Sequence, residues 1–169
     1  MTDLPRLTLV LGGARSGKSR YAEQLLMQVP GPWAYVATAE ALDEEMRDRI
    51  AHHRNRRDER WQTRDAPIEL AQALDQLPGP VLVDCLTLWL SNVMLARRDV
   101  DQECETLANA MAAASGPLVA VSNEVGLGLV PETPLGRAFR DAQGRLNQRI
   151  AAVADRVVFM AAGLPLNLK

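Results

Sequence analysis

The chain has little cysteine, almost no lysine and no long apolar run, and the first and last of these shortages each exclude a class of protein. Its two cysteines, Cys85 and Cys104, lack the spacing of metal ligands and are too few for a disulfide framework. We expect them to be reduced thiols in a cytoplasmic protein. No stretch approaches the roughly 18 apolar residues of a membrane span. The first residues, Met1–Arg6, show no signal-peptide pattern.

Charge of neither sign dominates the chain. The 19 basic and 21 acidic side chains give a net charge of −2, so no general basic field predicts a nucleic-acid partner. Lysine occurs only at Lys18 and Lys169, and arginine supplies the rest of the positive charge. A group of arginines is interpreted either as a solvated helix face or as an anion-binding surface; it consists of Arg47, Arg49, Arg54, Arg56, Arg57, Arg60 and Arg64.

Short apolar runs alternate with helical patterns, which is typical of an α/β domain with a parallel central sheet. At 169 residues the chain is predicted to form one domain, residues 1–169. The predicted strands are Leu7–Leu11, Trp33–Ala37, Val81–Asp84, Leu118–Ser122 and Val157–Met160, with a further short strand at Trp61–Thr63. The predicted helices are Ser19–Gln28, Asp43–Arg57, Ile68–Leu77, Thr87–Ala96, Gln102–Ala114 and Leu135–Ala154, and the apolar stripe of the last is expected to face the core.

A phosphate-binding motif follows the first predicted strand. Residues Gly12-Gly13-Ala14-Arg15-Ser16-Gly17-Lys18-Ser19 fit the pattern G-x-x-x-x-G-K-[ST] at every fixed position. Glycines let backbone N–H groups approach a polyanion at the positive end of a helix dipole. Lys18 adds a charge near the β- and γ-phosphates, and the Ser19 hydroxyl is placed for Mg²⁺. The motif predicts that the protein binds a nucleoside triphosphate.

A carboxylate ends another predicted strand, Val81–Asp84. In folds with a phosphate-binding loop, an acid at such a position holds Mg²⁺ directly or through water. Asp84 is therefore a candidate metal ligand, and the alternative is that it caps the helix predicted at Thr87–Ala96. The long loop Asn123–Pro134, rich in glycine and proline, suits a binding loop at the carboxyl end of a strand.

Two adjacent histidines lie in the predicted helix Asp43–Arg57. His53 shares an apolar stripe with Met46 and Ile50, which favours a packed, hydrogen-bonded imidazole. His52 falls between Arg49 and Arg56 on a polar stripe, where positive neighbours keep an imidazole neutral. A neutral imidazole is a nucleophile, so His52 is the candidate for covalent chemistry.

Several motifs together make the chain resemble the bifunctional adenosylcobinamide kinase/adenosylcobinamide-phosphate guanylyltransferases of cobalamin biosynthesis. The resemblance spans nearly the whole length. Its motifs are Gly12–Arg20, Tyr35–Ala39, Asp43–Met46, Arg49–Arg54, Trp61–Thr63, Val83–Thr87, Ser122–Pro131, Phe139–Asp141, Gly144–Gln148 and Leu166–Lys169. The His-His and Asn-Glu-Val-Gly segments are the most specific of these motifs.

The resemblance implies a three-layer, RecA-like P-loop fold, a homotrimer and two reactions. The first reaction transfers the γ-phosphoryl group of ATP or GTP to adenosylcobinamide. The second transfers GMP from GTP to adenosylcobinamide phosphate through a covalent GMP–histidine, here on His52. The implied nucleotide contacts are Gly12, Gly13, Ala14, Arg15, Ser16, Gly17, Lys18, Ser19, Ala37, Thr38, Ala39, His53, Arg54, Asn55, Arg56, Asp65 and Asp84, with Ser19 and Asp84 as Mg²⁺ ligands and Lys18 catalytic.

Other functions stay open at this point. The chain also fits a single-activity kinase in which His52 only binds phosphate, or a nucleotide-dependent regulatory module without turnover. The two implied reactions use different phosphates, so one loop must present GTP in two ways or a second pocket must exist. Movement of the helix carrying His52 relative to the loop is one hypothesis that reconciles the two reactions.

Overall fold

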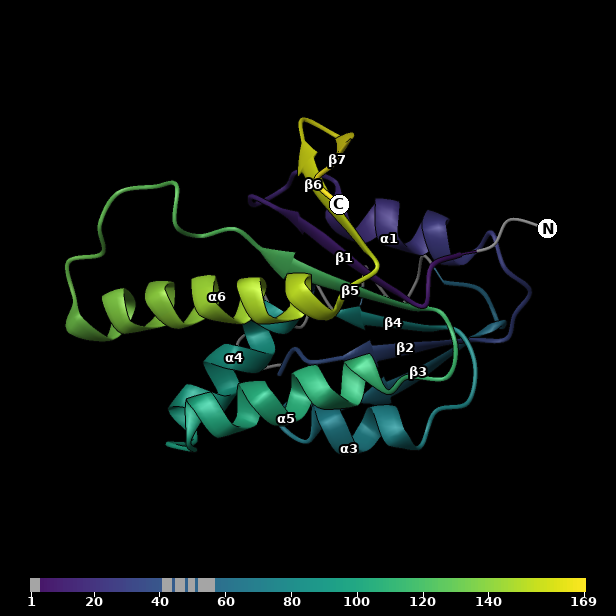
Figure 1. Ribbon diagram of the computed structural model, residues 1–169, viewed down its shortest axis with the longest axis horizontal. Coiled ribbons are helices and arrows are strands. Elements are labelled where there is room, and N and C mark those ends of the chain that lie inside the picture. Colours follow the sequence, from purple (N-terminus) through teal and green to yellow (C-terminus); the bar gives the residue numbers. More distant parts are fainter. Residues whose placement is uncertain (1–3, 41–43, 45–47, 49–50, 52–56) are drawn as a thin grey trace.

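A seven-stranded sheet forms the centre of the molecule. The computed structural model describes residues 4–40, 44, 48, 51 and 57–169. The strand order is β3-β2-β4-β5-β1-β6-β7, and every pairing is parallel except that of β6 with β7 (Figure 1). The strands are β1 Leu7–Gly12, β2 Trp33–Ala37, β3 Trp61–Asp65, β4 Val81–Asp84, β5 Leu118–Asn123, β6 Arg156–Ala161 and β7 Leu164–Asn167.

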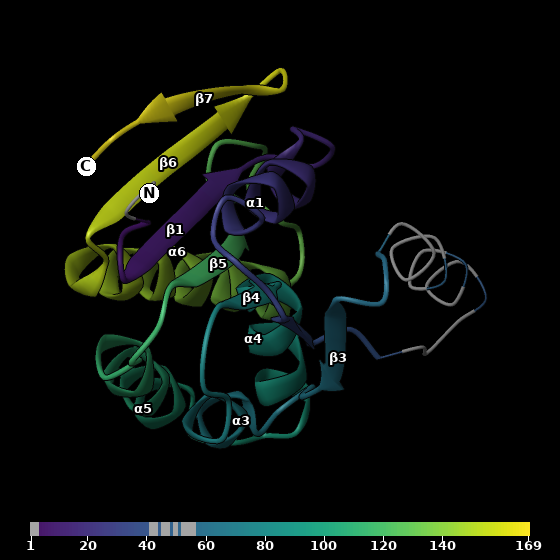
Figure 2. The same cartoon turned by 90° about the vertical axis from the view of Figure 1, so that its right-hand side faces the viewer.

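Helices cover both faces of this sheet. Those of the described segments are α1 Lys18–Leu26, α3 Leu70–Asp75, α4 Leu86–Leu95, α5 Val100–Ala112 and α6 Pro134–Val153. Helix α1 lies on one face, and the other four lie on the opposite face (Figures 1 and 2). The predicted three-layer α/β fold is therefore confirmed. No helix within the described residues is long and apolar enough to cross a membrane.

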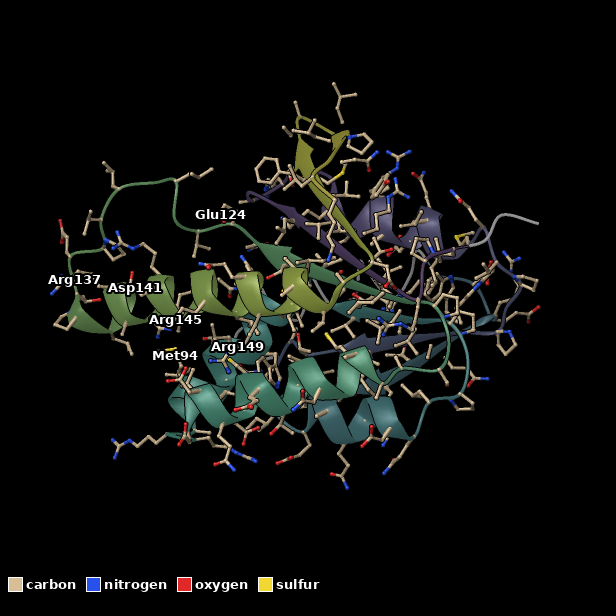
Figure 3. All side chains as sticks on the ribbon, viewed as in Figure 1. Met94, Glu124, Arg137, Asp141, Arg145 and Arg149 are labelled. Atoms are coloured by element: carbon tan, nitrogen blue, oxygen red, sulfur yellow. The ribbon has the colours of Figure 1, made fainter. Side chains whose placement is uncertain are left out.

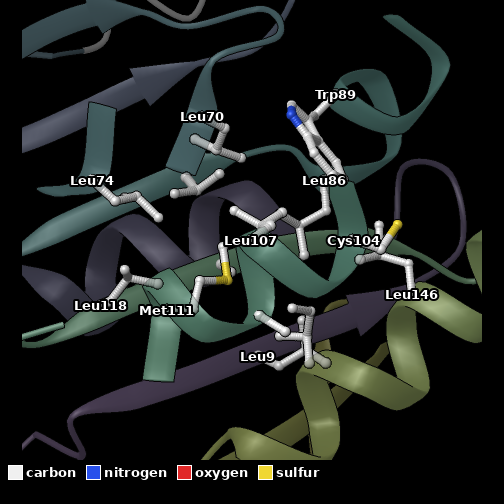
Figure 4. Close-up of a cluster of buried hydrophobic side chains, with 14 of the residues drawn as sticks. Leu9, Leu70, Leu74, Leu86, Trp89, Cys104, Leu107, Met111, Leu118 and Leu146 are labelled. Atoms are coloured by element: carbon white, nitrogen blue, oxygen red, sulfur yellow. The ribbon is translucent and has the colours of Figure 1, made fainter. Parts of the chain in front are cut away.

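Two apolar cores result from the alternation of side chains along the buried strands. Leu7 and Leu9 of β1 point to the side of α3–α6, whereas Val10 packs with Leu25 and Leu26 of α1. The larger core consists mainly of leucines from several helices and strands, and Trp89 and Met111 pack beside these leucines (Figure 4). Both cysteines are free and buried, so the expectation of unpaired thiols is confirmed.

Local signals define where the last long helix begins. The Thr133 hydroxyl accepts a hydrogen bond from the Gly136 N–H at 3.0 Å, and Pro134 occupies the first turn. The apolar stripe predicted to face the core consists of Leu135, Phe139, Ala142, Leu146, Ile150 and Val153. Ala142, Leu146 and Ile150 are buried, but Leu135 is 59% exposed. The prediction for Leu135 was wrong because the first turns of α6 extend past the sheet (Figure 1).

The other predicted elements agree with the structure to within a few residues. The strand at Trp61–Thr63 is confirmed and extends to Asp65. Strand β7 was not predicted. It turns back from β6 through Ala162 and Gly163, which have φ values of 51° and 78°, and it forms an exposed antiparallel edge. The helix predicted at Asp43–Arg57 lies mostly outside the described residues, so it stays a prediction.

Candidate nucleotide site

The carboxyl ends of the parallel strands bring most of the predicted site to one edge of the sheet. Strand β1 leads into the loop Gly12–Ser19, β2 into Ala37–Ala39, and β3 and β4 end in Asp65 and Asp84. Ala37 pairs in register with both aspartates, so the three residues form one row across β3, β2 and β4. Ligands of open parallel sheets bind at this edge.

The phosphate-binding loop needs its glycines for two different reasons. A Cβ on Gly12 would lie only 2.6 Å from Ser16 Oγ and 2.7 Å from the Met160 carbonyl oxygen, so no larger residue fits. Gly17 has a φ of 95°, a left-handed conformation that favours glycine, immediately before α1. The loop therefore turns back over the end of β1 and directs α1 away from it.

Lys18 is the charged group at the centre of this loop. Its side chain is buried, and its ammonium donates a hydrogen bond to the carbonyl of Gly13. The Ser16 hydroxyl is buried without a hydrogen-bond partner among the described residues. The loop thus places the Lys18 ammonium and the unpartnered Ser16 hydroxyl two residues apart in the chain, at the start of α1.

The carboxyl-terminal hairpin supports the loop from the other side. The Gly163 N–H donates to the Ser16 carbonyl at 3.0 Å, and a Cβ on Gly17 would lie 3.4 Å from Gly163 Cα. The turn between β6 and β7 therefore contacts the phosphate-binding loop directly. Sequence reasoning missed this contact because the two segments lie at opposite ends of the chain.

Asp84 is held at the end of β4 by a buried tyrosine. The Tyr35 hydroxyl donates to Asp84 Oδ2 at 3.2 Å. Burial raises the pKa of Tyr35 well above its usual range, and the Asp84 charge raises it further, so the phenol stays a donor. Helix α4 begins after Cys85 as its cap, with no side-chain cap bond. Asp84 is therefore not the helix cap, and the alternative structural interpretation was wrong.

Lys18 and Asp84 act electrostatically on the same buried thiol. Burial raises the pKa of Cys85 to about 11; the Asp84 charge also raises it, and the Lys18 charge lowers it. Asp84 precedes Cys85 in the chain, and Cys85 packs in the same apolar core as Ala22 and Leu25 of α1, the helix that begins at Lys18. The cation of the loop and the carboxylate of β4 belong to one region at the edge of the sheet.

Thr38 has a structural role in this edge. It is fully buried, its hydroxyl donates to the Cys85 carbonyl at 2.7 Å, and it accepts from the Cys85 N–H at 2.8 Å. The Asn92 amide donates to the Thr38 carbonyl at 2.9 Å. These bonds join the ends of β2 and β4, so Thr38 holds the backbone next to Asp84 in place. The half-buried Ala37 and Ala39 flank Thr38 in the chain.

Asp65 lies farther from the loop than Asp84. It ends the edge strand β3 and is exposed, and four strand spacings separate β3 from β1. At about 4.8 Å per spacing, that is roughly 19 Å across the sheet. This distance separates Asp65 from phosphates held by the loop, and its role as a nucleotide contact stays a prediction.

The histidine segment is only partly described. His52, His53, Arg54, Asn55 and Arg56 lie outside the described residues, so their predicted roles stay predictions. Arg57 follows them, and its guanidinium carbon lies 3.4 Å from the centre of the Tyr35 ring. It also donates to the Thr63 hydroxyl at 3.2 Å. Arg57 thus attaches the end of this segment to β2 and β3, beside the Tyr35 that holds Asp84.

The other described arginines of the group contact protein groups. Arg60 pairs with Asp58 at 2.7 Å and lies 4.7 Å from the Trp33 ring, and Arg64 donates to Gln76. For these residues the interpretation as a solvated face is the better one. Sequence reasoning did not find the contacts of Tyr35 with Asp84 and Arg57, because a tyrosine inside an apolar strand carries no signal of its partners.

The donors at this edge suit Mg²⁺ bound together with a nucleotide. Among the described residues, no group of three His, Cys, Asp or Glu side chains is placed to hold a metal. Mg²⁺ commonly takes one or two protein oxygens and completes its shell with phosphates and water. One carboxylate, Asp84, and one hydroxyl, Ser19, both half-buried, match that donor set.

The chain is similar to enzymes of one biosynthetic route. Residues 8–168 match the CobU family, described as cobinamide kinase / cobinamide phosphate guanyltransferase. It is 46% identical over 166 residues to the bifunctional adenosylcobalamin biosynthesis protein CobP of Pseudomonas aeruginosa, covering 95% of this chain and 96% of that protein. It is 38% identical to CobU of Salmonella typhimurium, covering 96% of this chain and 99% of that protein.

Solved structures resemble the chain in fold alone. The flagellar accessory protein FlaH of Methanocaldococcus jannaschii aligns with a TM-score of 0.54 at 13% identity, over 98% of this chain and 79% of that chain. The VirB11 ATPase of Brucella suis aligns with a TM-score of 0.51 at 15% identity, over 98% of this chain and 49% of that chain. These likenesses confirm the predicted RecA-like arrangement of sheet and helices.

Proposed function

The chain belongs to the CobU family of cobinamide kinases and cobinamide phosphate guanylyltransferases of cobalamin biosynthesis, and we propose that both reactions use the phosphate-binding loop Gly12–Ser19. The observation that carries this proposal is that the loop and Asp84 lie at the same carboxyl edge of the sheet, at the ends of strands two spacings apart. Lys18 is the only lysine near this edge, since the other is Lys169 at the carboxyl terminus.

In the kinase reaction, the loop amides and Lys18 hold the triphosphate of ATP or GTP, and the cobinamide hydroxyl attacks the γ-phosphorus. The residues act chiefly by positioning the phosphates and offsetting their charge. The unused Ser16 hydroxyl is a further donor for a phosphate oxygen. Ser19 and Asp84 would hold Mg²⁺, which supplies charge neutralisation on the phosphate oxygens when bound.

In the guanylyltransferase reaction, His52 attacks the α-phosphorus of GTP, and pyrophosphate leaves. The GMP on the imidazole is then transferred to a phosphate oxygen of cobinamide phosphate, which regenerates the free histidine. Thr38, Asp65, His53, Arg54, Asn55 and Arg56 are the proposed contacts of the nucleoside and its phosphate. Arg57 supports this step by attaching the segment to Tyr35.

The assembly and location of the enzyme are further parts of the proposal. We propose a homotrimer in the cytoplasm, acting on adenosylcobinamide and adenosylcobinamide phosphate. Free, buried cysteines agree with a reducing compartment.

A product assay tests the two activities against the single-activity and regulatory alternatives. The protein is incubated with Mg²⁺, GTP and adenosylcobinamide, and corrinoids and pyrophosphate are separated and quantified. We expect adenosylcobinamide phosphate first, then adenosylcobinamide-GDP with one pyrophosphate per guanylyl group. Accumulation of the phosphate alone would indicate a single-activity kinase, and no corrinoid product with GTP or ATP would indicate a regulatory module.

A further inference from the structure

Glu124 follows β5, the strand that separates the phosphate-binding strand from the strand of Asp84. Asn123 pairs in register with Gly12, and the Glu124 N–H donates to the Gly12 carbonyl at 3.0 Å. Figure 3 shows Glu124 at the point where the chain leaves the sheet and enters the long loop before α6. Glu124 therefore lies beside the first residue of the phosphate-binding loop.

A buried polar network fixes the backbone from which Glu124 extends. The Asn123 N–H donates to the Thr87 hydroxyl at 2.8 Å, and the Asn123 carbonyl accepts from the Asn147 amide at 3.0 Å. The Ser122 hydroxyl donates to Asn147 Oδ1 at 2.7 Å, and Gln143 donates to Ser122 at 2.9 Å. These bonds anchor the end of β5 to α4 and α6, and Gln143 Oε1 is the one buried side-chain atom of this network without a partner among the described residues.

The carboxylate of Glu124 is available for chemistry. It is half-buried, and Oε1 accepts a hydrogen bond from the Gly126 N–H at 2.7 Å. Within the described part of the chain, no lysine or arginine forms an ion pair with it. One oxygen is oriented by the backbone, which leaves Oε2 for a ligand.

Glu124, Asp84 and Asp65 lie at different distances from β1, the strand that leads into the phosphate-binding loop. Glu124 is one strand spacing from β1, about 5 Å, whereas Asp84 is two spacings away and Asp65 four, about 10 and 19 Å. Asp84 also accepts from Tyr35. Of the three carboxylates that follow or end strands at this edge, Glu124, Asp84 and Asp65, Glu124 is therefore the one nearest the strand that leads into the loop.

We propose that Glu124 is the general base of the kinase step, which rests on the proposed function of the loop. Its carboxylate takes the proton of the cobinamide hydroxyl as that oxygen bonds to the γ-phosphorus. The bond from the γ-phosphorus to the bridging oxygen breaks, and the electron pair leaves with the nucleoside diphosphate. The proton then passes to solvent. A positioned base of this kind contributes about 100- to 10,000-fold.

The guanylyltransferase step needs no such base. Its two nucleophiles are a neutral imidazole and a phosphate oxygen, and neither carries a proton that must be removed. The proposal therefore predicts that loss of the carboxylate affects one of the two activities only. This difference separates a catalytic role of Glu124 from a structural one, because damage to the loop would lower both activities.

The test measures both activities in Glu124→Gln, Glu124→Asp and the control Glu132→Gln. Glu132 is an exposed carboxylate of the same loop. We expect Glu124→Gln to lower the kcat of corrinoid phosphorylation by about 100-fold or more. Formation of GMP–protein and its transfer to supplied adenosylcobinamide phosphate should keep the wild-type rate. Glu124→Asp should restore part of the kinase activity, and Glu132→Gln should match the wild type.

The pH profile gives a second readout. The acidic limb of the kinase kcat, which reports the ionisation of the base, should be present in the wild type and absent in Glu124→Gln. An unchanged kinase kcat, or an equal loss of both activities, would overturn the proposal. An error in the proposed function would give a different result. If the two reactions do not share the loop, Lys18→Ala will retain one of the two activities.

Discussion

The Lys18→Ala variant is expected to lose corrinoid phosphorylation and GMP–protein formation together, each by about 100-fold or more. We propose that each reaction binds its triphosphate in the loop Gly12–Ser19, of which Lys18 is the buried cation. Loss of this charge should then weaken triphosphate binding in both reactions. Rates are measured with γ-labelled and α-labelled GTP in parallel.

Lys169→Ala is the matched control for this variant. Lys169 is the only other lysine of the chain, and its ammonium donates to the carbonyls of Ala151, Ala152 and Ala154 at the end of α6. The control should lose some stability because helix-end carbonyls lose a charged donor. It should keep both activities, which shows that the effect at Lys18 is not that of removing any lysine.

The His52→Asn variant is expected to abolish the acid-labile label that α-labelled GTP leaves on the protein. Asparagine has no ring nitrogen to attack phosphorus, so guanylyl transfer should fall by about 1,000-fold or more, as for loss of other covalent nucleophiles. Corrinoid phosphorylation should continue, because that step takes the γ-phosphoryl group directly. The product should then accumulate as adenosylcobinamide phosphate.

His53→Asn distinguishes the two neighbouring histidines. It should retain the label at saturating GTP, since the polar stripe of His52 and not the apolar stripe of His53 is predicted to carry the nucleophile. Because His53 is a proposed nucleotide contact, the KM for GTP should rise. Label that persists in His52→Asn, or that disappears only in His53→Asn, would show that the nucleophile is assigned to the wrong residue.

Much of the fold could be predicted from the sequence because its strands are short apolar runs buried on both faces. Leu7–Leu11 and Trp33–Ala37 match β1 and β2 almost to the residue. Strand β7 escaped prediction for physical reasons. It is exposed throughout, it contains Pro165, and its turn residue Ala162 has an unfavourable φ of 51° for a non-glycine residue.

The candidate site, like the fold, could be predicted only in part. Gly12–Ser19 and Asp84 could be proposed as nucleotide and Mg²⁺ contacts from local patterns, and the structure places them at one edge of the sheet, while the contacts themselves stay predictions. Contacts between distant residues could not be predicted: Tyr35 with Asp84, Thr38 with Cys85 and Gly163 with Ser16. Each of these contacts depends on strand order, because neighbours in the sheet are far apart in the chain. Thr38 therefore proved to be a fixed structural element as well as a predicted nucleotide contact.

The number of nucleotide sites per chain shows whether one phosphate-binding loop serves both reactions. Equilibrium binding is measured with α,β-methylene GTP, which cannot be attacked at the α-phosphorus to release pyrophosphate. If the loop is shared, one analogue binds per chain, ATP displaces it completely, and Lys18→Ala does not bind it. Two sites per chain, or a site that survives in Lys18→Ala, would contradict a shared loop.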